Sequence, residues 1–302
     1  MSSSQPQKDN SWLPIYLALG AVWGCSFIFI KLGLEFLTPF GVAFGRCALG
    51  ALTLLAWAKY KGIALPESKK VLFHLWVVSL LLNVIPGVFF ALAETEVTSV
   101  LAGIINAVTP LMTLLAIMVV TRNEKPKLHQ VVGILIGFTG VLTVLGAWKG
   151  LGDNPLWAIL ILLAAVTCYG FSFPYSRRFV LQHKLAPESI AAGQVTLGAL
   201  TLLPFFIYNG IDKYEYKAAP VFAMIALGVF GSGFAYIWNF KVMALAGSAV
   251  ASSVTYLTPV VAVIVGVIFL QEKIHWYEPV GALVVLLGAA IGQNRIKLSL
   301  VK

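Results

Sequence analysis

One arginine lies inside a long apolar segment, where a charged side chain needs a specific reason. Arg46 is the only Lys, Arg, Asp or Glu residue within residues 39–57. A charge in apolar surroundings is costly unless a partner compensates it. Because a guanidinium group binds carboxylates through two parallel hydrogen bonds, Arg46 is a candidate anion site. The competing interpretation is a packing role, with the guanidinium group bonded to carbonyl groups or extended toward the surface.

Uncharged polar residues stand in other apolar segments at helical spacings. Asn106 and Thr109 are three residues apart, as are Thr255 and Thr258, so each pair shares one helix face. Such groups could bind a solute, or they could make the modest hydrogen bonds that join apolar helices. The predicted substrate-binding residues are Arg46, Asn83, Asn106, Thr255, Trp23, Ser26, Tyr169, Ser172, Gln194 and Tyr256.

Aromatic residues accompany these polar groups. Trp23 and Tyr169 each lie three residues before a serine of the predicted set. Further aromatic residues inside the apolar segments are Phe27, Phe173, Tyr236 and Trp238. They could form an apolar cavity wall against a flat side chain, although aromatic residues also serve ordinary packing.

Two prolines stand near the middle of their apolar segments, each directly after a threonine. They are Pro110 and Pro259. Proline removes one backbone hydrogen bond of a helix and kinks or breaks it. The pair therefore predicts two hinges, with two static kinks as the alternative.

The composition indicates which elements must position these residues. Hydrophobic residues make up 59% of the 302 residues and charged residues only 11%, and the mean hydropathy is +0.90. A soluble domain cannot bury that much apolar surface, so we expect an integral membrane protein with the lipid bilayer as its partner. The net charge of +9 is spread over short connections. Nucleic acid is therefore not an expected partner.

The apolar segments divide the chain into ten predicted transmembrane helices. About 20 apolar residues cross a bilayer as a helix. The segments are residues 10–30, 39–57, 71–93, 97–121, 128–148, 154–176, 189–211, 218–240, 242–271 and 279–294. Most of the 21 Lys and Arg residues fall in the connections on the same side as the N-terminus. This bias predicts a multi-pass protein with both termini in the cytoplasm.

An internal repeat relates the two halves of the chain. The sequence GALTLL occurs at residues 50–55 and again at 198–203, and WGCSFIFIK at 23–31 matches YGFSFPYSR at 169–177. Thr-Pro at 109–110 matches 258–259, and Glu-Lys at 124–125 matches 272–273. Because five crossings precede the second copy, the copies must have opposite orientations. We therefore predict an N-terminal tail (1–11), two five-helix repeats (12–148 and 149–294) and a C-terminal tail (295–302).

These motifs resemble a known family. The WG-S-F-K pattern in the first helix, the arginine in the second, and the proline and glutamate of the fourth are similar to EamA-type members of the drug/metabolite transporter superfamily. The resemblance covers nearly the whole chain. It implies a ten-helix inverted repeat that exports small metabolites, often amino acids, by alternating access.

The sequence therefore predicts an exporter of a small-molecule substrate, such as an amino acid, in the plasma or inner membrane. Its cavity is expected between the repeats, with Arg46 attracting a carboxylate. One alternative is efflux of lipophilic or cationic drugs, which needs a membrane-embedded acidic group. An alternative of another class is a membrane scaffold without transport.

Signals for other chemistries are missing from the sequence. No GxxxxGK[ST] motif occurs, so direct ATP coupling is not expected. The four His and three Cys residues form no metal-ligand spacing and no nucleophile–base pair is present, so neither a metal, a cofactor nor an enzyme is predicted. Coupling to protons or to the membrane potential stays open. Glu94 and Glu96 are expected at an outer helix end in a solvated turn, with proton sensing as the alternative. The chain is expected to be a monomer or a weak homodimer.

Overall fold

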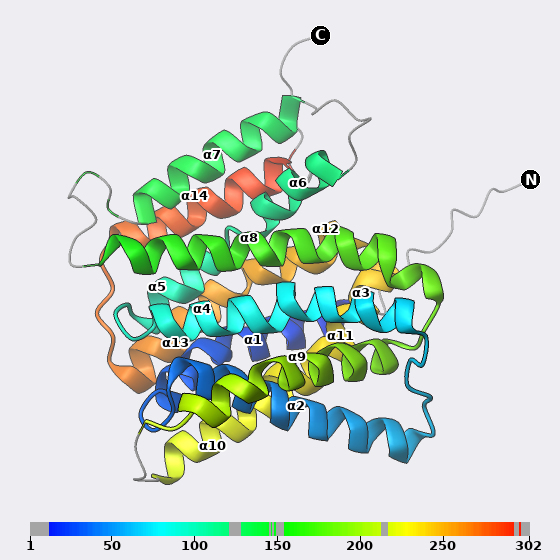
Figure 1. Cartoon of the computed structure of the whole chain (residues 1–302). Helices are drawn as coiled ribbons and strands as arrows, with labels where there is room; N and C mark the ends of the chain where they lie inside the picture. Colours follow the sequence, from blue (N-terminus) through cyan, green and yellow to red (C-terminus); the bar gives the residue numbers. More distant parts are fainter. Residues whose placement is uncertain are drawn as a thin grey trace, which may run out of the picture.

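Helices make up almost all of the described chain, which comprises residues 12–120, 128–144, 146, 148, 154–212, 217–292 and 296 of the computed structural model (Figure 1). The first half contains α1 (Leu13–Gly33), α2 (Pro39–Lys61), α3 (Lys69–Ser79), η1 (Leu80–Val84), α4 (Ile85–Ala93), α5 (Ser99–Asn106), α6 (Thr109–Val120) and α7 (Leu128–Val144). The second half contains α8 (Leu156–Phe179), η3 (Leu181–His183), α9 (Pro187–Asn209), α10 (Ala218–Ala226), η4 (Leu227–Phe234), α11 (Ala235–Ala246), α12 (Ser248–Ser252), η5 (Ser253–Tyr256), α13 (Thr258–Leu270) and α14 (Tyr277–Gly292). The predicted tails, apart from residue 296, and the Glu-Lys pair at 124–125 lie outside the described residues.

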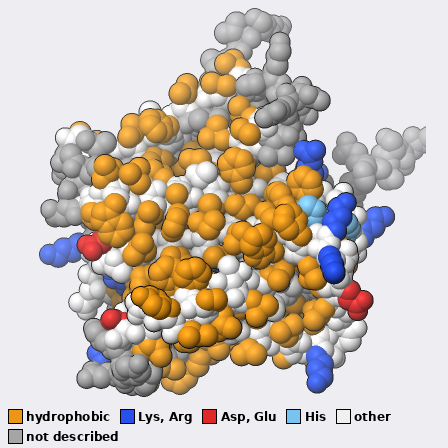
Figure 2. Space-filling model, viewed as in Figure 1, with side chains coloured by type: hydrophobic (Ala, Val, Ile, Leu, Met, Phe, Trp, Pro, Cys, Tyr) orange, Lys and Arg blue, Asp and Glu red, His pale blue; other side chains and the backbone are white. Residues whose placement is uncertain are grey.

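The helices have the lengths and the surface that a bilayer requires. Eight helical segments of the described chain are long and apolar enough to cross a membrane, and two shorter apolar helices span Val131–Val144 and Tyr277–Gly292. Figure 2 shows a broad apolar belt on one face, with charged side chains gathered at the two edges where the helices end. The lipid core solvates apolar side chains and excludes charges, which accounts for this distribution. The predicted all-α integral membrane fold is confirmed.

Helices α2 and α9 show that the two repeats run in opposite directions. At one end of this pair, the hydroxyl group of Thr38 donates a 2.6 Å hydrogen bond to the carbonyl of Asn209, and an isolated antiparallel bridge joins Leu37 and Ile211. At the other end, the hydroxyl group of Ser189 donates a 2.8 Å bond to the carbonyl of Ala64. The start of each helix therefore lies beside the end of the other, as the inverted repeat predicts.

Glycines at matched positions let the two repeats approach each other closely. A Cβ atom on Gly50 would lie 3.0 Å from the backbone of Ser232, and one on Gly198 would lie 2.5 Å from Ser79 Oγ and 3.4 Å from Asn83 Cβ. These glycines are the first residues of the two GALTLL copies. Each one contacts the irregular segment of the opposite repeat, so the repeated motif marks packing between repeats.

Interruptions of the helices also occur at matched positions. The π-helical segments η1 and η4 interrupt the third and eighth crossings. The fourth crossing breaks between α5 and α6, and the ninth breaks at the 3₁₀ turn η5 between α12 and α13. Pro110 and Pro259 each occupy the second position of the helix that follows the break. A first-turn proline costs little because its missing N–H needs no helical partner, so each proline begins a half-helix.

The close contact at Gly170 yields a stability prediction. A Cβ atom there would lie 2.6 Å from the backbone of Met112 in α6. We expect Gly170→Ala to destabilise the fold by about 1–3 kcal/mol, because overpacking forces the backbone of α8 and α6 apart. The measurement is the melting temperature of the purified protein in detergent.

Gly87→Ala is the matched control for this substitution. The nearest side-chain atom to a Cβ atom at Gly87 is Ala43 Cβ at 3.6 Å, an ordinary contact distance. Its melting temperature should equal or exceed that of the wild type, because alanine favours a helix more than glycine does. Equal melting temperatures for the Gly170 variant and the wild type would contradict the prediction.

Candidate substrate site between the repeats

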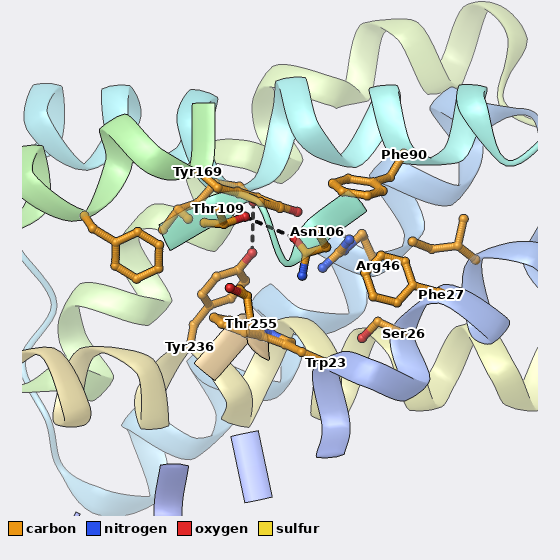
Figure 3. Close-up of a pocket in the computed structure, with 13 residues that line it drawn as sticks. Trp23, Ser26, Phe27, Arg46, Phe90, Asn106, Thr109, Tyr169, Tyr236 and Thr255 are labelled. Carbon is orange, nitrogen blue, oxygen red and sulfur yellow. Dashed lines mark hydrogen bonds between the residues drawn. The ribbon is translucent and has the colours of Figure 1, made fainter. Parts of the chain in front are cut away.

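A buried pocket lies where the two repeats meet, and both repeats supply its walls (Figure 3). The lining residues are Trp23, Ser26, Phe27, Ile30, Arg46, Leu82, Phe90, Asn106, Thr109, Tyr169, Phe173, Tyr236 and Thr255. The cavity volume is about 40 Å³, which is room for a few water molecules. In this conformation the walls must therefore move apart before a solute as large as an amino acid can enter.

Arg46 is the charged residue of the pocket lining and comes from the first half of α2. Its side chain is 4% exposed. Its Nε atom donates a 2.9 Å hydrogen bond to the hydroxyl oxygen of Ser232, and the guanidinium group also interacts with the hydroxyl group of Tyr169. No carboxylate of the described residues lies within ion-pair distance of it. A buried cation with neutral partners is suited to binding an anion, because an anion would compensate its desolvation.

The equivalent position in the second repeat holds a neutral pair. Asn83 donates a 2.7 Å hydrogen bond from Nδ2 to Oε1 of Gln194. Asn83 is the repeat partner of Ser232, and Gln194 is the repeat partner of Arg46, so the two bonds are symmetry equivalents. Both amides are fully buried, and neither lines the pocket. The repeats have thus diverged at this position, with one copy carrying a charge into the pocket.

A short hydrogen-bond chain joins the broken helices of the fourth and ninth crossings. Asn106 donates from Nδ2 to Thr258 Oγ1 at 3.1 Å and accepts a 3.3 Å bond at Oδ1 from Thr109. Thr258 in turn donates to the carbonyl of Thr255 at 2.8 Å. The predicted pairs therefore meet across the repeats at the two interruptions.

Two pocket aromatics satisfy backbone carbonyls in the π-helical segments. Trp23 donates from Nε1 to the carbonyl of Gly231 in η4 at 3.1 Å. Tyr236 donates from its hydroxyl group to the carbonyl of Leu82 in η1 at 3.0 Å. Leu82 and Gly231 directly precede the repeat partners Asn83 and Ser232, so these are equivalent carbonyls. The irregular backbone and the pocket wall are therefore stabilised by the same side chains.

The structure brings six of the ten predicted residues into the pocket. They are Arg46, Asn106, Thr255, Trp23, Ser26 and Tyr169. Figure 3 shows the aromatic side chains around Arg46 and Asn106. The lining aromatics Phe27, Phe173 and Tyr236 were expected only as possible wall residues, and Ile30, Leu82 and Phe90 were not identified. Apolar residues in apolar helices carry no sequence signal that would separate them from ordinary packing.

The other four predicted residues lie outside the pocket lining. Asn83 and Gln194 bond to each other, as described above. Ser172 donates its hydroxyl to the carbonyl of Tyr169 at 2.6 Å, within its own helix. Tyr256 is half-buried and packs against the hydrophobic core. A serine hydroxyl that bonds to its own backbone cannot be distinguished by sequence from one that faces a cavity.

Inverted repeats of apolar helices with a pocket between them are typical of membrane transporters. The chain matches the model of the EamA-like transporter family at residues 10–146 and 156–291. It therefore belongs to this family.

Similar proteins support that assignment over nearly the full length. An uncharacterized transporter of Archaeoglobus fulgidus is 27% identical over 92% of this chain and 96% of its own. The uncharacterized inner membrane transporter YedA of Escherichia coli K12 is 30% identical over 87% of this chain and 86% of its own. A solved crystal structure has the same fold, with a TM-score of 0.68 at 18% identity over 94% of this chain and 97% of that one.

The hydrogen bond from Tyr236 to Leu82 yields a second stability prediction. We expect Tyr236→Phe to destabilise the protein by about 1–3 kcal/mol, because it leaves a buried carbonyl of η1 without a partner. The melting temperature of the detergent-purified protein measures the effect. Tyr208→Phe is the control, since that side chain is 91% exposed and should show no change. Identical melting temperatures for the two variants would refute the stabilising role of this bond.

Proposed function

We propose that this transporter exports a small zwitterionic metabolite, an amino acid with an apolar side chain, by alternating access. The observation that carries the proposal is Arg46, a buried guanidinium group with neutral hydrogen-bond partners in a pocket lined by aromatic rings. Arginine binds a carboxylate through two parallel, charge-assisted hydrogen bonds. An anion at Arg46 is therefore the simplest way to compensate its charge.

The remaining lining residues provide complementary chemistry for the rest of such a substrate. The side chains of Asn106 and Thr255 supply hydrogen-bonding groups in the same pocket, with Asn106 beside Arg46 (Figure 3). An ammonium group is attracted to the face of an aromatic ring, which Trp23 or Tyr169 would offer. Apolar rings also favour an apolar substrate side chain over a charged one. A substrate with a carboxylate, an amine and an apolar group fits all three features.

Alternating access is supported by where the pocket lies. The cavity is too narrow for an amino acid in this conformation, so transport requires the walls to separate. The walls include both helix breaks, and Pro110 and Pro259 begin the half-helices that follow them. We propose that these two positions are the hinges of the movement. The words "inner membrane" in the name of YedA support a location in the inner or plasma membrane. The excess of Lys and Arg residues in the connections on the N-terminal side supports both termini in the cytoplasm.

Two other functions make different predictions. Efflux of lipophilic cations is disfavoured because a cation in this pocket would meet the charge of Arg46. A scaffold without transport would not need a pocket with a buried arginine between inverted repeats. Cells that overproduce the protein should retain less of a toxic amino-acid analogue. Dye efflux without this effect would favour the cation alternative, and liposomes that move no solute from a broad panel would favour the scaffold.

Substitution of Arg46 tests the proposed anion site. We expect Arg46→Gln to weaken binding of L-phenylalanine about 10- to 100-fold, because hydrogen bonds to charged groups contribute about 1.5–3 kcal/mol. Arg46→Lys should give an intermediate loss, since lysine keeps the charge but lacks the planar fork. Calorimetry on the purified protein measures the affinity, and proteoliposome flux measures transport.

The second repeat indicates that the Arg46→Gln variant can fold. Glutamine occupies the equivalent position 194, where it bonds to Asn83, so Arg46→Gln should keep a partner in Ser232 and remain folded. The control is Arg178→Gln, because Arg178 is exposed at the end of α8. Wild-type affinity in a folded Arg46→Gln variant would sink the proposal that Arg46 binds the carboxylate.

A further inference from the structure

Glu94 follows α4 at the end of the bundle that also contains Leu37 and Ile211, which we call the Glu94 end. A solvated turn was expected here, but that expectation is wrong for Glu94. Its side chain is 0% exposed, and neither carboxylate oxygen has a hydrogen-bond partner among the described residues. Glu96, two residues further on, is exposed as expected. A buried carboxyl group without partners is costly as an anion and is stabilised by taking up a proton.

The charged groups that face Glu94 are Lys31, Glu272 and Arg46. Lys31 does not pair with the carboxylate, because its ammonium group donates to the backbone carbonyls of Glu94 at 2.6 Å and Val97 at 3.1 Å. Glu272 is engaged at the start of α5, where its oxygens accept bonds from Ser99 and Val100. The three groups therefore surround a carboxyl that makes no bond to any of them.

Glu94 lies directly behind the pocket wall. It follows Phe90 of α4 by one helical turn, and Phe90 lines the pocket. On the facing helix α1, Ile30 lines the pocket and its neighbour Lys31 reaches the backbone of Glu94. Residues next to Glu94 on α4 and next to Lys31 on α1 therefore line the pocket, so the carboxyl group lies near it.

We propose that Glu94 is a proton-binding site whose protonation is linked to carboxylate binding at Arg46. The proposal rests on the proposed function, since it requires an anionic ligand at Arg46. Ionised Glu94 and the ligand carboxylate repel each other and compete for the positive charge of Arg46 and Lys31. Protonated Glu94 removes that competition, so a proton and an anionic ligand bind cooperatively, and each strengthens the other by the same factor.

Glu94 lies just outside the membrane-spanning segment Lys69–Ala93. The direction of the pH dependence follows from the burial of its carboxyl group. Burial raises the pKa of Glu94 well above its ordinary value, and the neighbouring Lys31 lowers it in part. A bound carboxylate raises this pKa further. Ligand affinity is therefore highest at low pH, and it falls as the pH rises through the pKa of Glu94 in the ligand-free protein.

Calorimetry at several pH values tests the linkage. The probes are L-phenylalanine and 3-phenylpropanoate, the second of which has no titrating amine, and the range is about pH 5.5 to 8.5. We expect the affinity of the wild-type protein to fall by up to about tenfold per pH unit above the pKa of Glu94. Titrations in two buffers of different ionisation enthalpy should show uptake of up to one proton per ligand.

Glu94→Gln should bind both probes at every pH with the affinity that the wild type has at low pH, and without proton uptake. Glu96→Gln is the matched control, because the exposed neighbour should leave the pH dependence unchanged. Binding to the wild type with no pH dependence and no proton uptake would overturn the linkage alone. Failure of both probes to bind at any pH would overturn the proposed substrate class, and the linkage with it. The proton count on the wild type needs no variant, so a misfolded Glu94→Gln protein would not prevent a decision.

Discussion

Backbone groups that cross a membrane have no water to bond to, so an interrupted helix must find its partners inside the protein. The irregular segments of this chain meet that requirement across the repeat interface. The carbonyls of Leu82 and Gly231, in the two π-helical segments, accept bonds from Tyr236 and Trp23. Those aromatic side chains also line the pocket. The pocket therefore lies where the irregular backbone finds its hydrogen-bond partners, and a change there affects the stability of the fold and the shape of the pocket together.

Pseudo-symmetry explains why the two repeats contact each other through equivalent residues, while divergence explains why only one contact carries charge. Arg46 bonds to Ser232 in η4, and Gln194 bonds to Asn83 in η1. Each bond therefore joins a helix of one repeat to the π-helical segment of the other. An inverted repeat with arginine in both copies would bury two like charges near each other. A neutral amide in one copy avoids that repulsion, so only one of the two equivalent positions carries a charge.

The sequence was sufficient for the helices, their inverted order and the register between the repeats, because apolar length and matched landmarks define them. It also identified Arg46, since a charge in an apolar segment is conspicuous. It did not indicate which of two equivalent residues faces the cavity, as with Arg46 and Gln194. It also misplaced Glu94, because the burial of a helix end depends on which neighbouring elements cover it. The covering of a helix end is a property of the tertiary structure, and neither residue spacing nor composition indicates it.

Those covering elements would couple the Glu94 end to the proposed movement of the repeats. Glu272 belongs to the second repeat, and it accepts bonds from two backbone N–H groups at the start of α5 in the first. A carboxylate at a helix N-terminus is stabilised by unpaired N–H groups and by the helix dipole. Any opening of this end must break these bonds and the contacts of Lys31 to the nearby carbonyls. The same opening would bring water to Glu94, so the proton could exchange only when the end is open, and the carboxyl would be sealed again when it closes.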